Sequence, residues 1–495
     1  MNSSSADPPH ADSLGTLAAR SLGWVVIDKW GTRVASLLTL VVLGRLLAPT
    51  DFGLVALASM FITFAGIFVE QGFGKALIQR PELRPEHIDT AFWTALAVAI
   101  VLTIATMLAA VPLAAAVNSP ALAPVLRWLA PGLLINALSA TPSALLERSF
   151  GFKSLALRRL ASTLAGGIAA VTVAFAGGGV WSLVAQTLVG AVAGLVTLWA
   201  ATQWRPRGQF SFLALQELWP VGFGVLGIEV LGFIGGQADR LLVGAFLGTR
   251  ALGLYFMAMR IVSIMVEIFA SIFSAVSMTM FSRLQHDHAR LRDWLYRLTG
   301  ASSAVTLPCF ALAAALAPIG LPFVMGSQWT ASVTIFQVLS LLGAINSVAY
   351  FDRSVLLATG RARDAFLLTL GQSVLGVALI LVAAPYGVLA IAVAVVARQY
   401  VYWPIRLAVL RRAVAIKPRA YLAQWLRPCV AALLMFAVIY GTTWRWPVLM
   451  SIPILFMAAA ALIGGGIYLV VLRLLDPKVF VDVRGAFESL RRARN

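Results

Sequence analysis

Apolar runs of about 20 residues or longer recur along the whole chain, and a helix of that length is what crosses the hydrocarbon of a bilayer. The chain has 495 residues, of which 60% are hydrophobic and only 12% are charged. Soluble domains are roughly half apolar and about a quarter charged. The sequence therefore predicts an all-α polytopic membrane protein.

Fourteen transmembrane helices are expected, in two six-helix bundles with two further C-terminal helices. The expected spans are 21–45, 52–79, 90–116, 122–146, 156–177, 180–203, 217–247, 252–281, 295–321, 331–357, 365–384, 388–410, 421–443 and 448–474. The expected domains are an N-terminal tail (1–20), a first bundle (21–204), a linker (205–216), a second bundle (217–412), helices 13 and 14 (421–474) and a basic C-terminal tail (475–495).

The distribution of charge predicts the topology. The 38 Lys and Arg residues outnumber the 20 Asp and Glu residues, which gives a formal net charge of +18. Most of the basic residues fall in or beside alternate loops and the tails, while the intervening loops, such as 176–179 and 385–387, are short and uncharged. This alternation is the positive-inside pattern. It places both termini in the cytoplasm, and it explains the positive charge without nucleic acid as a partner.

The sequence also repeats itself at an offset of 200 residues. Within Val42–Ala58 and Leu242–Ala258, five positions are identical. Gly44, Leu47, Gly53, Leu54 and Ala58 recur as Gly244, Leu247, Gly253, Leu254 and Ala258. Six expected spans separate equivalent points, and an even number preserves orientation. The pattern indicates two parallel six-helix repeats, one of the architectures of transporters.

Several charged residues fall inside the expected spans, where an ionised group costs about 2.5–3.5 kcal/mol on insertion scales. They are Asp28, Lys29 and Arg33 in span one, Glu70 in span two, Glu229 in span seven, Arg260 and Glu267 in span eight, and Arg398 in span twelve. One interpretation is that these charges only pair and hold the bundles together. The other is that they line a hydrated cavity that binds an anionic head group such as a pyrophosphate.

In the cavity interpretation the two signs of charge have different roles. The candidate contacts to the anion are the cations Lys29, Arg33, Arg260 and Arg398. The candidate groups for coupling to protons or another cation are the carboxylates Asp28, Glu70, Glu229 and Glu267. Span two adds a stripe of small and polar residues at helical spacing that ends in its carboxylate: Ser59, Thr63, Gly66, Glu70 and Gly74.

Span seven is rich in glycine, with Gly232, Gly235 and Gly236 at its centre. Glycine weakens a helix and allows close packing. These residues are a candidate hinge for alternating access, with plain helix packing as the other interpretation. No metal site, cofactor or enzymatic activity is expected, since the chain has only two cysteines and no phosphate-binding glycine loop after a strand.

Local motifs add a family resemblance. The motifs are Asp51–Leu54 (DFGL), Gly72–Gly74 (GFG), Ala76–Arg80 (ALIQR), Asp89–Trp93 (DTAFW) and Asp239–Gly244 (DRLLVG). Together they resemble the Wzx-like polysaccharide transporters of the MOP flippase superfamily. The resemblance implies a V-shaped fold in the bacterial inner membrane. It also implies export of undecaprenyl-pyrophosphate-linked oligosaccharides for exopolysaccharide, capsule or O-antigen synthesis.

The same resemblance implies partners and site residues. Membrane lipids, protons or sodium, and a polysaccharide polymerase with its co-polymerase are the expected partners. Related flippases for peptidoglycan precursors carry charged cavity residues in spans one, two and eight. Asp28 and Lys29 resemble the first of these and Arg260 the last, whereas span two has Glu70 in place of a basic residue.

Two other functions stay open from the sequence. A multidrug or organic-cation antiporter of the same superfamily should have a mainly acidic and aromatic cavity without several basic residues. A membrane-embedded polysaccharide polymerase should have a large outer loop, and every expected outer loop here is short.

Overall fold

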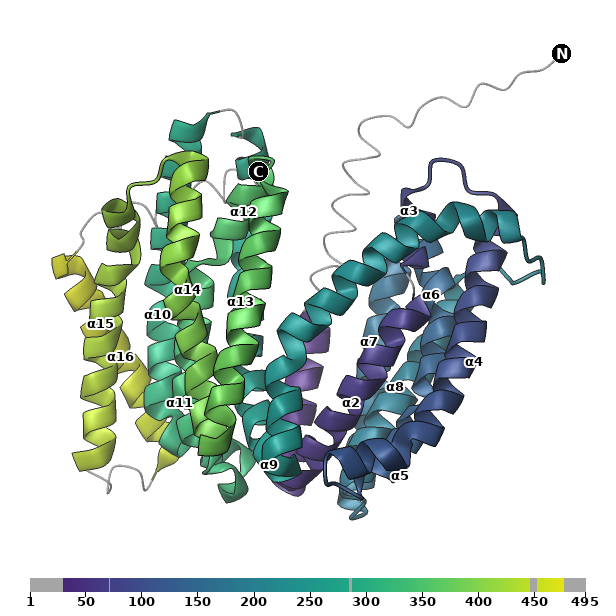
Figure 1. Ribbon diagram of the computed structural model, residues 1–495. Helices are drawn as coiled ribbons and strands as arrows, with labels where there is room; N and C mark the ends of the chain where they lie inside the picture. Colours follow the sequence, from purple (N-terminus) through teal and green to yellow (C-terminus); the bar gives the residue numbers. More distant parts are fainter. Residues whose placement is uncertain (1–29, 71, 285–286, 446–451, 476–495) are drawn as a thin grey trace. The chain divides into compact units, whose positions relative to one another are not determined.

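The computed structural model describes residues 30–70, 72–284, 287–445 and 452–475, and within these residues all regular structure is helical (Figure 1). Internal contacts group the chain into two units, Met1–Ile234 and Gly235–Asn495. The expected bundle limits, 21–204 and 217–412, stay a prediction. Asp28 and Lys29 lie outside the described residues.

The first unit begins with a helix that covers residues 30–46 in the described part. Its other helices are α2 (Pro49–Glu70), α3 (Phe73–Gln79), α4 (Pro85–Ala116), α5 (Leu122–Leu129), α6 (Gly132–Arg148), α7 (Phe152–Phe175), α8 (Val180–Ala201) and the first part of α9 (Phe212–Arg283). The second unit contains the rest of α9, α10 (His288–Met325), α11 (Ser332–Val348), α12 (Tyr350–Ala358), α13 (Ala362–Ala383), α14 (Val388–Val414), α15 (Pro418–Arg445) and α16 (Pro453–Leu475), with the short 3-10 helices η1 (Ser327–Trp329) and η2 (Ala384–Tyr386).

The expected fourteen crossings fit these helices. Eleven helical stretches of the described chain are long and apolar enough to span a membrane. One of them, Phe212–Phe273, has 62 residues, roughly three times the length that one crossing needs, and it kinks at Gly248. The break at Gly248 divides it into the two crossings that were expected over 217–247 and 252–281. α7 and the helix over residues 30–46 complete the set.

Three expected spans are broken where they were predicted to be continuous. The span 52–79 divides into α2 and α3 next to Gly72, whose φ of 68° is a left-handed conformation that glycine adopts at little cost. The span 122–146 divides into α5 and α6 beside Pro131, and 331–357 divides into α11 and α12 at Ala349. Apolar composition does not reveal such breaks, because both halves remain hydrophobic.

The internal repeat corresponds to a repeated change of chain direction. The first helix ends before Ala48, whose backbone N–H donates to the Asp51 carboxylate over 3.0 Å. At the position 200 residues later, Gly248 interrupts α9 with φ 79° and ψ 176°. The repeated alanines Ala58 and Ala258 are both fully buried. Both copies therefore have a break followed by a buried helical turn.

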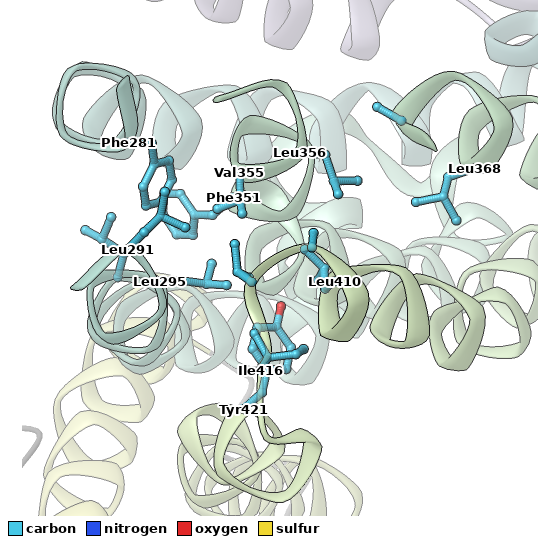
Figure 2. Close-up of a cluster of buried hydrophobic side chains, with 14 residues drawn as sticks. Phe281, Leu291, Leu295, Phe351, Val355, Leu356, Leu368, Leu410, Ile416 and Tyr421 are labelled. Carbon is cyan, nitrogen blue, oxygen red and sulfur yellow. The ribbon is translucent and has the colours of Figure 1, made fainter. Parts of the chain in front are cut away.

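The second unit has an apolar core where α10, α12, α14 and α15 meet (Figure 2). Figure 2 shows the hydroxyl oxygen of Tyr421 among the apolar side chains of this core. That hydroxyl donates to Asp352 Oδ1 over 2.8 Å, and both residues are buried. Because an unpaired buried carboxylate is costly, this bond fixes α12 against α15.

Candidate functional site

The first unit contains a cavity of about 750 Å³, within the range of ligand-binding pockets. Its walls come from α2, α3, α5, α6, α7, α8 and the first part of α9. The charged and polar side chains of the lining are Ser59, Thr63, Glu70, Lys75, Asn136, Ser139, Ser143, Glu147, Arg158, Thr187 and Glu229. Among the described residues of the lining there is no aromatic ring.

The polar stripe predicted for span two lies on one wall of this cavity. Ser59, Thr63, Gly66, Glu70 and Gly74 all belong to the lining. The first four follow one face of α2, while the last lies beyond the break in α3. Glu70 is exposed, and its Oε1 accepts a hydrogen bond from Asn136 Nδ2 of α6 over 3.3 Å. Glu70 therefore faces hydrogen-bonding groups and water in the cavity.

A second carboxylate, Glu229, pairs with Lys75. Lys75 Nζ lies 2.7 Å from Glu229 Oε1, and the two side chains are 56% and 51% exposed. The pair joins α3 to the first part of α9. Close packing at Gly72 supports this contact, because an added Cβ there would lie 2.7 Å from Val225 Cβ. An exposed ion pair is worth only about 0–1 kcal/mol, so this pair can exchange partners.

Arg158 is the other cation of the cavity and has a different environment. It is half-buried on α7, and its Nη1 donates to Ser143 Oγ of α6 over 2.9 Å. Glu70 acts on its charge electrostatically. Within the described part of the chain, however, no carboxylate forms an ion pair with Arg158. Its remaining N–H groups are free to bind a ligand.

The expected linker, 205–216, is fastened to α4 by hydrogen bonds. The backbone N–H of Arg207 donates to Asp89 Oδ2 and that of Ser211 to Thr90 Oγ1, each over 3.0 Å. Asp89 and Thr90 begin the DTAFW motif. This motif therefore has a structural role in the first unit.

Glu217, at the start of α9, is bound by three basic residues around the entry to α4. Arg80 forms an ion pair with it, Arg84 Nη2 lies 3.0 Å from Oε1, and His87 Nε2 lies 2.9 Å from Oε2. Because the backbone N–H of Arg84 donates to Nδ1 of His87, the proton on Nε2 is the one that Glu217 accepts. We refer to Arg80, Arg84, His87 and Glu217 as the Glu217 cluster.

Arg148, at the end of α6, binds the backbone that connects α3 to α4. Its guanidinium donates to the backbone oxygens of four residues in and after α3: Leu77, Ile78, Arg80 and Pro81. These carbonyls include the C-terminal end of a helix, where a cation is favourable. Arg148 therefore holds the α3–α4 connection, in addition to any effect on topology.

The other predicted site residues are distributed over both units. Arg33 lies near the ring of Trp30, 6.0 Å from its centroid, and is absent from the cavity lining. Arg260 and Glu267 are exposed on α9 in the second unit. Arg398, on α14, is half-buried and interacts electrostatically with Asp239 and Tyr255.

Asp239, which belongs to the DRLLVG motif, accepts a hydrogen bond within the second unit. The hydroxyl of the buried Tyr255 donates to Asp239 Oδ2 over 2.6 Å. Arg240, the next residue, donates to Gln237 and lies over the ring of Phe256. Asp239 and Arg398 are both half-buried and interact electrostatically in this unit, which favours a structural role for Arg398.

The predicted hinge glycines differ in their surroundings. An added Cβ at Gly232 or Gly236 would meet no atom within 4 Å, whereas one at Gly235 would lie 2.6 Å from Ser373 Oγ. The division between the two units falls between Ile234 and Gly235. Their role as a hinge stays a prediction.

Lys75 and Arg158 are among the basic residues beside the alternate loops, and the sequence did not indicate them as cavity residues. Lys75 is the third residue of α3 and Arg158 the seventh of α7, and so close to a helix end a loop charge and a cavity charge have the same sequence pattern. Asn136 had no signal beyond being a polar residue in an apolar span.

Residues 42–334 match the polysaccharide biosynthesis protein family. The chain is a member of this family. The predicted membership of the Wzx-like transporters is confirmed. Among relatives, the succinoglycan biosynthesis transport protein ExoT of Rhizobium meliloti is 30% identical over 322 residues, which are 65% of this chain and 65% of that protein. The lipopolysaccharide biosynthesis protein WzxC of Escherichia coli is 22% identical over 352 residues, 70% of this chain and 71% of that protein.

Solved structures show the fold of this polysaccharide biosynthesis protein. The lipid II flippase MurJ, in an inward closed conformation, matches with a TM-score of 0.74 at 16% identity, over 92% of this chain and 99% of its own. An inward-facing multidrug resistance MATE family transporter of the MOP superfamily matches with a TM-score of 0.63 at 14% identity, over 80% of this chain and 98% of its own. The predicted all-α fold is confirmed.

Proposed function

We propose that this protein is a flippase that moves undecaprenyl-pyrophosphate-linked oligosaccharide repeat units from the cytoplasmic to the outer leaflet of the bacterial inner membrane. The observation that carries the proposal is the cavity of the first unit, with its hydroxyl, amide, carboxylate and cationic side chains. Sugar hydroxyls both donate and accept hydrogen bonds, so they match the carboxylates and amides of this lining. The names of the relatives, which include succinoglycan transport and lipopolysaccharide biosynthesis, support this cargo class.

The lining argues against the drug-transporter alternative. Flat organic cations bind best to aromatic faces, and the described lining, which holds three carboxylates and two cations, has no aromatic ring. The polymerase alternative receives no support from the relatives, whose names include a transport protein.

The proposal also includes alternating access and cytoplasmic termini. It further includes coupling to protons or sodium through Glu70, Glu229 or Glu267.

Deletion of the gene tests this function. We expect one surface polysaccharide to disappear while its lipid-linked repeat units accumulate inside the cell, measured by lipid extraction and mass spectrometry. A plasmid copy of the gene should restore export. An unchanged polysaccharide together with greater drug sensitivity in the deletion strain would overturn the flippase assignment.

A further inference from the structure

Arg158 is a cation inside a membrane protein that forms no ion pair within the described part of the chain. Its guanidinium uses one N–H for the neutral Ser143 hydroxyl, 2.9 Å away, and lines the cavity with the others. A half-buried cation without a contact ion pair is unfavourable, and Glu70 acts on Arg158 only through space. An anionic ligand at this position would supply the missing charge.

Arg158 is held in place by its neighbours on two helices. Ser143 of α6 fixes the guanidinium, and Gly194 of α8 leaves room for the aliphatic part, since an added Cβ there would lie 3.7 Å from Arg158 Cγ. A side chain fixed in this way loses little further entropy when it binds a ligand. The planar guanidinium also suits two phosphate oxygens at once.

The expected topology predicts that Arg158 lies near the level of the lipid phosphates. It is the seventh residue of α7, about 9 Å from the helix start at 1.5 Å per residue. α7 begins in the basic segment 148–159, which we place at the cytoplasmic surface. Head groups occupy roughly the outer 5–8 Å of each leaflet. The guanidinium therefore lies near the level at which the phosphates of a cytoplasmic-leaflet lipid enter the protein.

Lys75 is a second cation of the same cavity, held by Glu229 in an exposed pair. A diphosphate carries more charge than a carboxylate and forms stronger hydrogen bonds with an ammonium group. It can therefore replace Glu229 as the partner of Lys75.

We propose that Arg158 is the primary group that binds the diphosphate of the cargo when it loads from the cytoplasmic leaflet, and that Lys75 joins it by exchanging Glu229 for a phosphate. This inference rests on the proposed function and names the head-group subsite within it. The carboxylates and amides of the lining then face the sugars.

Binding of undecaprenyl pyrophosphate to the purified full-length protein in detergent tests the subsite. We expect Arg158→Gln to weaken binding by about tenfold or more, the effect of losing one charge-assisted hydrogen bond or two. Arg158→Lys keeps the charge but not the planar fork and should have an intermediate effect. The matched control is Arg159→Gln, which removes an exposed charge from the next position and should bind as the wild type does.

Two further ligands identify the source of the phosphate. Inorganic pyrophosphate should compete only weakly and phosphatidylglycerol should not compete, because the subsite combines diphosphate recognition with access from the membrane. Arg158→Gln and Arg158→Lys proteins that bind undecaprenyl pyrophosphate as tightly as the wild type would overturn the subsite and leave the flippase function standing. A wild-type protein that does not bind this lipid would instead overturn the pyrophosphate-linked cargo.

The exchange at Lys75 predicts an effect of opposite sign. Glu229→Gln removes the competing carboxylate and should strengthen binding of undecaprenyl pyrophosphate by a few fold. The same substitution in a Lys75→Gln background should have no effect. Equal or weaker binding by the Glu229→Gln protein would show that Lys75 does not exchange its partner.

Discussion

Glu217 brings together three basic residues that the sequence shows only as basic side chains near a loop. Arg80, Arg84 and His87 approach this one carboxylate at the start of α9. The side chain of His87 is 1% exposed, so its Nε2–H has no access to water as an alternative acceptor. At the scale of single residues, basic residues of this region therefore stabilise the first unit.

We expect Glu217→Gln to lower the thermal unfolding midpoint of the purified protein by about 2–4 °C. The neutral amide cannot form an ion pair with Arg80 or Arg84, and it offers one acceptor oxygen for hydrogen bonds in place of two. The matched control is Glu86→Gln on α4, an exposed position at which the same charge is removed. Equal midpoints for the two variants would contradict the stabilising role of the Glu217 cluster.

At the scale of the element, α9 combines three features along its length. Its first residues are fixed to α4 by the Glu217 cluster, its middle contains Gly232, Gly235 and Gly236, and Gly248 redirects it. Contacts assign residues before Gly235 to the first unit and later residues to the second. A bend at these glycines would let the two parts of α9 move separately.

The hinge proposal predicts that Gly232→Ala combined with Gly236→Ala slows polysaccharide export. Alanine stabilises a straight helix by about 1 kcal/mol per site, so a required bend becomes about fivefold rarer for each substitution. No neighbouring atom would clash with the new methyl groups. Export rates in the complemented deletion strain provide the measurement.

The control for this experiment lies on the same helix. Gly224→Ala combined with Gly227→Ala also adds methyl groups without neighbours within 4 Å, but it does so before the glycine cluster. We expect normal export from this protein. A wild-type rate in the Gly232 and Gly236 double variant, at equal membrane amounts, would remove these residues from the mechanism.

At the scale of the whole molecule, the alternation of basic and uncharged loops defines two sides of the membrane. Ala176 and Tyr386 lie in loops expected outside, and Gln209 lies in the linker expected inside. All three are exposed, so their side chains can react. The two native cysteines, Cys309 and Cys429, can be replaced by Ser to give a background without thiols.

In that background, a membrane-impermeant maleimide should label Ala176→Cys and Tyr386→Cys in cells whose outer membrane is permeabilised. It should label Gln209→Cys only after the inner membrane is permeabilised. A permeant maleimide, which should label all three, controls for reactivity. Labelling of Gln209→Cys in sealed cells would reverse the proposed orientation.

The polar stripe of α2 follows from helical spacing, and the internal repeat follows from identical residues 200 positions apart, which is why both were predictable. The face shared by Ser59, Thr63, Gly66 and Glu70 is set by positions three and four apart on α2, and all four line the cavity. The repeated break at Ala48 and Gly248 lies within the segment that the internal similarity identified. Local geometry alone decides these features.

Contacts between distant helices were not predictable. Lys75 and Glu229 are 154 residues apart, and Arg158 meets Ser143 across two helices. In an apolar chain the spacing of residues does not specify which helices become neighbours or where a continuous span breaks. Arg33, which the sequence offered as a candidate for the anion, is absent from the described lining of the cavity in the first unit, whereas Lys75 and Arg158 belong to it.

The sequence by itself determined that the chain forms membrane-spanning helices and that one half repeats the other. It also determined which loops carry the positive charge. The membrane helices and the basic loops follow from transfer free energies that act on each segment separately, and the repeat follows from identical residues 200 positions apart. Only the tertiary structure decided which charges share a cavity and which stabilise the first unit. Those outcomes depend on how several helices pack, since burial and pairing are properties of the assembled unit.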